Sequence, residues 1–164
     1  MIDLLLLLGF GGACLAAGAT GMLFKPGAWY RALAKPAWTP PNLAFPIVWT
    51  TLYVLMAWAA IRVAGAAAQG GPEAARAMAG LGLWSLQITL NALWSPIFFG
   101  LHRPRVALAV IGAMWLALAG TVWGFAGVDP VAAWMMAPAL VWASIAASLN
   151  AWIMRHNPAE AFTA

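Results

Sequence analysis

The chain has 164 residues, of which 65% are apolar and only 7% are charged. A soluble domain carries roughly a quarter of charged residues, so the composition excludes an ordinary water-exposed surface and predicts an integral membrane protein. The net charge of +4 would suggest nucleic acid in a soluble protein, but here the basic residues lie between apolar stretches. We therefore expect a lipid bilayer, and no nucleic acid, as the surrounding partner.

Five apolar stretches are each long enough to cross a bilayer as a helix, which takes about 20 residues. They cover about residues 4–24, 43–64, 75–101, 106–125 and 131–154, and glycine or proline interrupts the chain between them. The sequence therefore predicts an all-α integral membrane bundle of five transmembrane helices, with residues 1–164 forming a single domain.

The basic residues divide unevenly between the two sides of this predicted bundle. One side holds Arg62 and Arg76, and the other holds Lys25, Arg31, Lys35, Arg103, Arg105 and Arg155. Positive residues favour the cytoplasmic side of a membrane. We expect a multi-pass protein of the bacterial cell membrane with its N-terminus outside and its C-terminus in the cytoplasm, and an outer-membrane location stays open.

The segment between the first two predicted helices, residues 25–42, is rich in both proline and aromatic residues. Proline fixes φ and removes a backbone donor, so no long regular helix fits there. Disordered segments are poor in aromatic residues. We interpret this long loop as a folded lid over one end of the bundle.

Polar and aromatic residues recur on single faces of the predicted helices. Gln87, Asn91, Trp94 and Phe98 follow one another at steps of four, three and four residues, which lines one helical face. Similar faces occur in the second and fifth helices: Trp49, Tyr53, Met56 and Ala60, and then Trp134, Pro138, Trp142, Ile145 and Leu149. Such faces either hold helices together through hydrogen bonds or line a pocket for a large planar, apolar ligand.

Ordinary catalysis is not indicated by the sequence. The two histidines, His102 and His156, lie in predicted loops, and neither belongs to a metal-binding motif. The single cysteine, Cys14, allows no internal disulfide and is interpreted as a small packing residue. We therefore expect no catalytic residue of a conventional enzyme, no metal site and no required cofactor.

Several motifs together resemble those of the TspO/MBR family, the tryptophan-rich sensory proteins, whose mitochondrial members are called translocator protein or peripheral benzodiazepine receptor. The motifs are Trp38-Thr39-Pro40-Pro41, the segment FPIVWTTLY at 45–53, QITLNALWSPIFF at 87–99, and Pro138 with Val141-Trp142 and Leu149-Asn150. The resemblance extends over about residues 9–155, that is, over all five predicted helices.

The resemblance implies a five-helix bundle, usually dimeric, with a ligand cavity beneath the first loop. It also implies binding of tetrapyrroles such as protoporphyrin IX and haem, and of cholesterol. Together with Gln87 from the polar face described above, the expected ligand-binding residues are Ala19, Trp38, Trp49, Tyr53, Gln87, Asn91, Trp94, Trp142 and Ala146. One departure weakens the expectation for sterols, because the family's tyrosine is missing before Arg155.

The resulting hypothesis is a membrane receptor or sensor that binds tetrapyrroles and takes part in their transport or regulation. Two alternatives remain. One is light-dependent porphyrin degradation, since Trp49 and Trp142 match tryptophans that the family implicates in it, and the other is regulation of a membrane partner complex. A homodimer is also expected, and two faces of small residues suit either dimerisation or internal packing: Ala13, Ala17 and Gly21, and Ala75 and Ala79.

Overall fold

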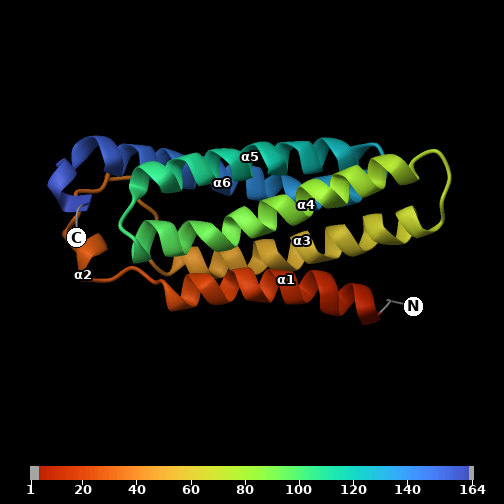
Figure 1. The fold of residues 1–164 in the computed structure, drawn as a ribbon, viewed down its shortest axis with the longest axis horizontal. Helices are drawn as coiled ribbons and strands as arrows, with labels where there is room; N and C mark the ends of the chain where they lie inside the picture. Colours follow the sequence, from red (N-terminus) through yellow and green to blue (C-terminus); the bar gives the residue numbers. More distant parts are fainter. Residues whose placement is uncertain (1–3, 163–164) are drawn as a thin grey trace.

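The structure, a computed structural model, describes residues 4–162. Within this range the regular elements are all helices, which confirms the all-α prediction. The long helices, which run along one another in Figure 1, are α1 (Leu4–Leu23), α3 (Ala44–Ala68), α4 (Ala74–Ser95), α5 (Pro104–Ala126) and α6 (Pro130–His156). The short elements are α2 (Ala28–Ala32), the π-helix η1 (Pro96–Gly100) and the 3₁₀-helix η2 (Ala159–Phe162).

The long helices form a closed ring in which α1 contacts α3, α3 contacts α6, α6 contacts α5, α5 contacts α4 and α4 contacts α1. A further contact between α3 and α4 crosses the ring, so α1 packs over the line where these two helices meet. The helix α2 and the C-terminus lie at one end of the bundle, and the N-terminus lies at the other (Figure 1). We call the end with α2 the roof end.

Two of the predicted elements differ from those observed. The predicted third helix, residues 75–101, is divided, because Pro96 has no amide hydrogen for the carbonyl one turn earlier. The chain widens there into η1, and the amide of Leu101 donates to the carbonyl of Pro96 at 2.9 Å. The predicted loop 25–42 contains the helix α2. Although Pro138 lies in the middle of α6, that helix continues through it to His156.

Four helices are long and apolar enough to cross a membrane, namely α1, α3, α5 and α6. The helix α4 is of similar length, with 22 residues, but it is more polar and does not meet the same criterion. Its polar residues Gln87 and Asn91 are buried inside the bundle. The polarity of α4 is thus partly hidden from its surroundings.

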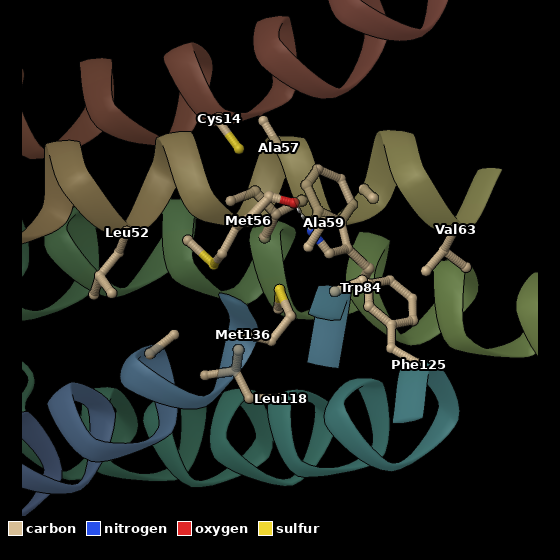
Figure 2. Packing of buried hydrophobic residues seen from close by; sticks show 14 of the residues in the cluster. Cys14, Leu52, Met56, Ala57, Ala59, Val63, Trp84, Leu118, Phe125 and Met136 are labelled. Atoms are coloured by element: carbon tan, nitrogen blue, oxygen red, sulfur yellow. Dashed lines mark hydrogen bonds between the residues drawn. The ribbon is translucent and has the colours of Figure 1, made fainter. Parts of the chain in front are cut away.

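The buried core is made of side chains from all five long helices. Figure 2 shows Cys14 from α1, Met56 from α3, Trp84 from α4, Phe125 from α5 and Met136 from α6 within one cluster. The indole Nε1 of Trp84 donates to the carbonyl oxygen of Met56 at 3.0 Å, which satisfies the one polar atom of that ring. The thiol of Cys14 is free, and its residue is buried, as a packing residue should be.

The helices α4 and α5 approach most closely where two glycines face each other. A Cβ atom added to Gly124 would lie 3.1 Å from the Cα atom of Gly80. A Cβ atom added to Gly80 would lie 2.9 Å from Cδ1 of Phe125. Small residues permit such close backbone approach between membrane helices, so this crossing depends on glycine at both positions.

We predict that Gly124→Leu destabilises the bundle by roughly 1–3 kcal/mol, because its side chain would overlap the backbone of α4. Thermal unfolding in detergent measures the effect. Gly82→Leu is the matched control, since Gly82 is exposed on α4 and has open space around the Cβ position. Equal melting temperatures for the two variants would contradict the close crossing.

The start of α6 is fixed by one carboxylate that makes two kinds of contact. Oδ1 of Asp129 accepts hydrogen bonds from the amides of Val131 and Ala132, at 3.0 and 3.2 Å, and so caps the helix. Oδ2 accepts from Nε of Arg62 at 2.7 Å. Burial alone would raise the pKa of Asp129, but the hydrogen bond from Arg62, the two amides and the nearby positive charge lower it below 3.8 overall.

The pKa of Asp129 is lower in the folded state than in the unfolded state. The ionised carboxylate therefore stabilises the protein above pH 3.8, and this contribution is lost as the pH falls through the folded-state pKa. We predict that Asp129→Ala costs about 1 kcal/mol at neutral pH, mainly through the lost helix cap. Asp129→Asn, which still caps, should cost less, because an ion pair this exposed contributes little. Melting temperatures measured from pH 7 to pH 3 should converge for wild type and Asp129→Asn, and a constant difference would contradict this account.

Candidate functional site

The first group of predicted site residues is linked by one hydrogen bond between α3 and α4. The hydroxyl of Tyr53 donates to Oδ1 of Asn91 at 2.6 Å, and Asn91 is 8% exposed. Trp49 lies one turn before Tyr53 on α3, and their rings stack with centroids 5.5 Å apart and an interplanar angle of 25°. Gly18 of α1 lies against the same tyrosine, since its Cβ position is 3.3 Å from Cε2 of Tyr53.

The second group surrounds a small enclosed cavity near the roof end. Trp94 lies one turn after Asn91, and its ring stacks on Phe98 with centroids 4.9 Å apart. The cavity beside these rings has a volume of about 20 Å³, which is room for about one water molecule. It is lined by residues from α2, α3, α4, η1 and α6: Tyr30, Phe45, Trp94, Phe98, Phe99, Ala146, Leu149, Asn150 and Ile153.

Trp142 joins this second group through Phe45. The two rings meet edge to face with centroids 5.5 Å apart. Phe45 lines the cavity, and so does Ala146, which lies one turn after Trp142 on α6. The aromatic side chains of α3, α4 and α6 therefore converge on one interior region.

Three buried side-chain polar atoms among the described residues have no hydrogen-bond partner: Nε1 of Trp94, Nε1 of Trp142 and Oε1 of Gln87. A buried polar group without a partner costs about 1–3 kcal/mol, so such groups are rare in folded proteins. Two of the three are indole donors beside the cavity region. These donors are available to a ligand that brings an acceptor.

Asn150, by contrast, has a hydrogen-bond partner within the protein for each polar atom of its side chain. It is 1% exposed, and both halves of its amide are satisfied when Nδ2 donates to the carbonyl of Pro104 and Oδ1 accepts from the amide of Leu108, each at 3.1 Å. It thereby ties α6 to the first turn of α5. Although Asn150 lines the cavity, both polar atoms of its amide already bond to α5, so its first role is to position helices.

The roof end closes the cavity with Tyr30, whose ring meets Phe98 and Phe99 edge to face. Nζ of Lys35 lies 4.8 Å above the Tyr30 ring and donates to the carbonyls of Tyr30 and Leu33, at 2.7 and 2.6 Å. Burial raises the pKa of the Tyr30 hydroxyl and lowers the pKa of the Lys35 ammonium. Since the lysine is bonded to carbonyls, its role here is to hold α2 and the turn after it together.

The structure does not bring every predicted site residue to the cavity. Of the predicted residues, only Trp94 and Ala146 line the cavity itself. Trp38 is 51% exposed, and Ala19 is half-buried on α1. Gln87 is fully buried, but it lies further from the roof end, where its Nε2 contacts Sδ of Met56 at 3.6 Å. Trp49, Tyr53, Asn91, Trp94, Trp142 and Ala146 do gather in the two groups described above.

Sequence reasoning left four cavity-lining aromatic residues out of the predicted site: Tyr30, Phe45, Phe98 and Phe99. Phe98 shares the helical face of Asn91 and Trp94, and Phe45, Phe98 and Phe99 lie in motifs that carry the family resemblance. Their position in the motifs was therefore a usable signal. Their effect, which is to fill the space that a ligand would need, depends on packing and has no sequence signature.

Fold and site together define a class of protein: a helical, multi-pass integral membrane protein with an aromatic interior site that holds unpaired donors. Residues 10–155 match the TspO/MBR family. The chain belongs to the TspO/MBR family.

Individual relatives agree with this assignment. The chain is 46% identical to protein CrtK of Rhodobacter capsulatus over 148 residues, which is 90% of each protein. It is 44% identical to the tryptophan-rich sensory protein of Cereibacter sphaeroides, over 95% of this chain and 94% of that one. It is also 35% identical to the human translocator protein, over 79% of this chain and 75% of the relative.

We predict that Tyr53→Phe destabilises the protein by about 1–3 kcal/mol, because Oδ1 of Asn91 would be left buried without its donor. Asn91→Leu, and the double variant with Tyr53→Phe, complete a double-mutant cycle read by thermal unfolding in detergent. The two changes should be clearly non-additive, since they remove the same bond. Additive changes would contradict a direct bond between the two side chains.

Proposed function

We propose that the protein is a membrane receptor or sensor that binds a planar, largely apolar ligand of the tetrapyrrole class, such as protoporphyrin IX or haem, among α3, α4 and α6. The observation that carries the proposal is the pair of buried indole donors, on Trp94 and Trp142, without a partner in an aromatic region. Flat rings stack well on a macrocycle. The donors would then meet its carboxylate acceptors.

The proposal takes α4 together with η1 as the fifth membrane span. Residues 74–100 amount to 27 residues, enough to cross about 30 Å of hydrocarbon. The two most polar side chains of its central part, Gln87 and Asn91, are buried against the other helices. A helix whose polar face is turned inward needs less overall hydropathy to be stable in lipid.

Charge supports both an orientation and a ligand chemistry. Five of the basic residues predicted on one side are exposed around the roof end: Lys25, Arg31, Arg103, Arg105 and Arg155. By the positive-inside tendency, this end faces the cytoplasm. The same positive field would attract a ligand with propionate groups.

The relatives support a role in sensing or moving the ligand, since two of them are named a tryptophan-rich sensory protein and a translocator protein. Homodimerisation is part of the proposal. The outer face of α1 exposes Leu4, Leu8 and Leu15, and the Cβ position of Gly12 is open. Sterol binding is a weaker part, because the segment before Arg155 lacks the family's tyrosine.

We predict that Trp142→Phe and Trp94→Phe each weaken the binding of protoporphyrin IX about three- to thirtyfold, since each removes one charge-assisted or neutral hydrogen bond and keeps a flat ring. Tryptophan fluorescence quenching during titration of the purified protein measures the affinity. Trp49→Phe should change the affinity less, because Trp49 offers mainly its ring face.

Trp123→Phe is the matched control, because Trp123 is 71% exposed on α5 and lies under Arg76 at the end away from the roof. Its affinity should equal that of the wild type. Wild-type affinity in both Trp142→Phe and Trp94→Phe, with folded protein, would contradict the proposed site.

Light-dependent porphyrin degradation is the second candidate. The stacking of Trp49 on Tyr53 favours it, because two oxidisable rings in contact suit the supply of an electron to an excited ligand. Illuminating the protein–porphyrin complex in air, with the dark complex as control, distinguishes the two functions. If the porphyrin absorbance is lost, and if this loss requires both light and Trp49, the result supports degradation. An unchanged spectrum contradicts degradation and supports binding as the only function of the two.

A further inference from the structure

The segment between α1 and α3, residues 24–43, is held by the last described residues of the chain. We call these two parts the roof segment and the tail, residues 157–162. Asn157 in the tail makes two bonds to one residue of the roof segment: its Oδ1 accepts from the amide of Ala34 at 2.8 Å, and its Nδ2 donates to the carbonyl of Ala34 at 3.0 Å. Its Nδ2 also donates to the carbonyl of Ile153 in α6 at 2.9 Å, which anchors the side chain to the bundle.

A second connection runs through Trp29 of α2. Its Nε1 donates to the carbonyl of Ala161 in the tail at 2.7 Å, and its ring meets Phe162 edge to face. The other side of the ring stacks on His102, with centroids 4.2 Å apart and an interplanar angle of 18°. His102 has a φ of 53°, which is unfavourable for a residue with a Cβ atom, so the turn before α5 is held in one shape partly by this stack.

The tail thereby contacts the neighbour of the residue that closes the cavity. Tyr30 is the neighbour of Trp29 in α2, and it is the residue of the roof segment that lines the cavity. A cavity of about 20 Å³ admits nothing as large as a macrocycle while Tyr30 stays in place. Because Trp29 and Tyr30 are neighbours in a helix of five residues, a movement of α2 that carries Tyr30 away from the cavity displaces Trp29 as well.

The bonds of the tail are suited to reversible release. Ala34 is exposed and Asn157 is half-buried, so water can replace the bonds between them when they break. Each bond of this kind contributes only a modest net free energy. The tail also lies beyond residue 155, where the match to the family ends.

We propose that the tail is a latch on the roof segment, with Asn157 as its main positioning residue, and that release of the latch sets the rate at which the interior site opens to its ligand. The proposal rests on the proposed function for the identity of the ligand. The opening of the roof segment does not depend on the proposed function, because it is measured without a ligand.

Opening is measured with a thiol placed in the cavity wall. In a Cys14→Ala background, Ala146→Cys puts a single thiol against the cavity, and a small maleimide should label it faster when the roof moves. We expect Asn157→Ala to speed this labelling roughly five- to tenfold, as expected when a few weak bonds that hold the closed state are removed. Asn157→Asp, which keeps the acceptor for the Ala34 amide and loses the donors, should give an intermediate rate.

Two controls separate the latch from general loosening. Ala159→Ser changes an exposed tail residue that makes no side-chain bond, and it should label at the wild-type rate. In a protein that retains Ala146, the native Cys14 is a buried thiol in the core of the bundle, and its labelling should not respond to Asn157→Ala. An unchanged rate for the cavity thiol, or an equal acceleration at Cys14, overturns the latch.

The Asn157→Ala variant and the wild type are then each mixed with protoporphyrin IX in a stopped-flow fluorimeter. Asn157→Ala should raise the association and dissociation rates by a similar factor, so that the affinity changes less than about threefold. Equal rates in wild type and Asn157→Ala overturn the latch as a gate for this ligand. Absence of binding in the wild type contradicts the proposed function instead, and the labelling experiment still decides whether the latch exists.

Discussion

A polar group in the hydrocarbon of a membrane needs a partner inside the protein, because there is no water to replace it. Most of the internal polar groups described above meet this condition. Trp84 donates to a backbone carbonyl of α3, Tyr53 donates to Asn91, and Asn150 bonds the first turn of α5. These bonds join helices that hydrophobic packing alone would leave free to slide, so they fix how α3, α4, α5 and α6 sit against one another.

The proposed function depends on internal polar groups that have no partner inside the protein. The indole donors of Trp94 and Trp142 are buried and unpaired, and both belong to the region where aromatic rings from α3, α4, η1 and α6 meet. A protein that only needed to pack would gain stability from phenylalanine at these positions. Tryptophan is costlier there without a ligand, and it becomes favourable once an acceptor is bound. The proposed ligand binding and the packing of the interior therefore favour different side chains at these two positions.

Much of this arrangement could be predicted from the sequence. Helical periodicity placed Asn91 and Trp94 on one interior face, and the observed burial of Asn91 agrees with it. Four of the predicted spans, α1, α3, α5 and α6, are confirmed as helices long and apolar enough to cross a membrane, whereas the more polar α4 does not meet this criterion. The widened turn at Pro96 could be expected only as a helix break, because proline removes a hydrogen bond without specifying what replaces it.

Other features depend on contacts between distant parts of the chain and have no local signature. The closing of the interior by Tyr30 and Phe45 requires α2, α3 and α6 to be in place, and no spacing in the sequence encodes it. The same holds for the contact between Asn157 and Ala34, which lie 123 residues apart. Trp38 was placed in the site by resemblance, but it is mostly exposed in this closed arrangement. Trp38 does not line the cavity, which agrees with the proposal that the roof segment moves when a ligand binds.

The most direct measurement is the indole NMR spectrum of the protein labelled with ¹⁵N-tryptophan, recorded with and without protoporphyrin IX and assigned with tryptophan-to-phenylalanine variants. The indole protons of Trp94 and Trp142 should move strongly when the ligand binds, because they gain an acceptor. The indole proton of Trp84, already bonded to the carbonyl of Met56, should move little. Saturable binding that leaves the resonances of Trp94 and Trp142 in place would contradict the account, because the ligand would then bind elsewhere.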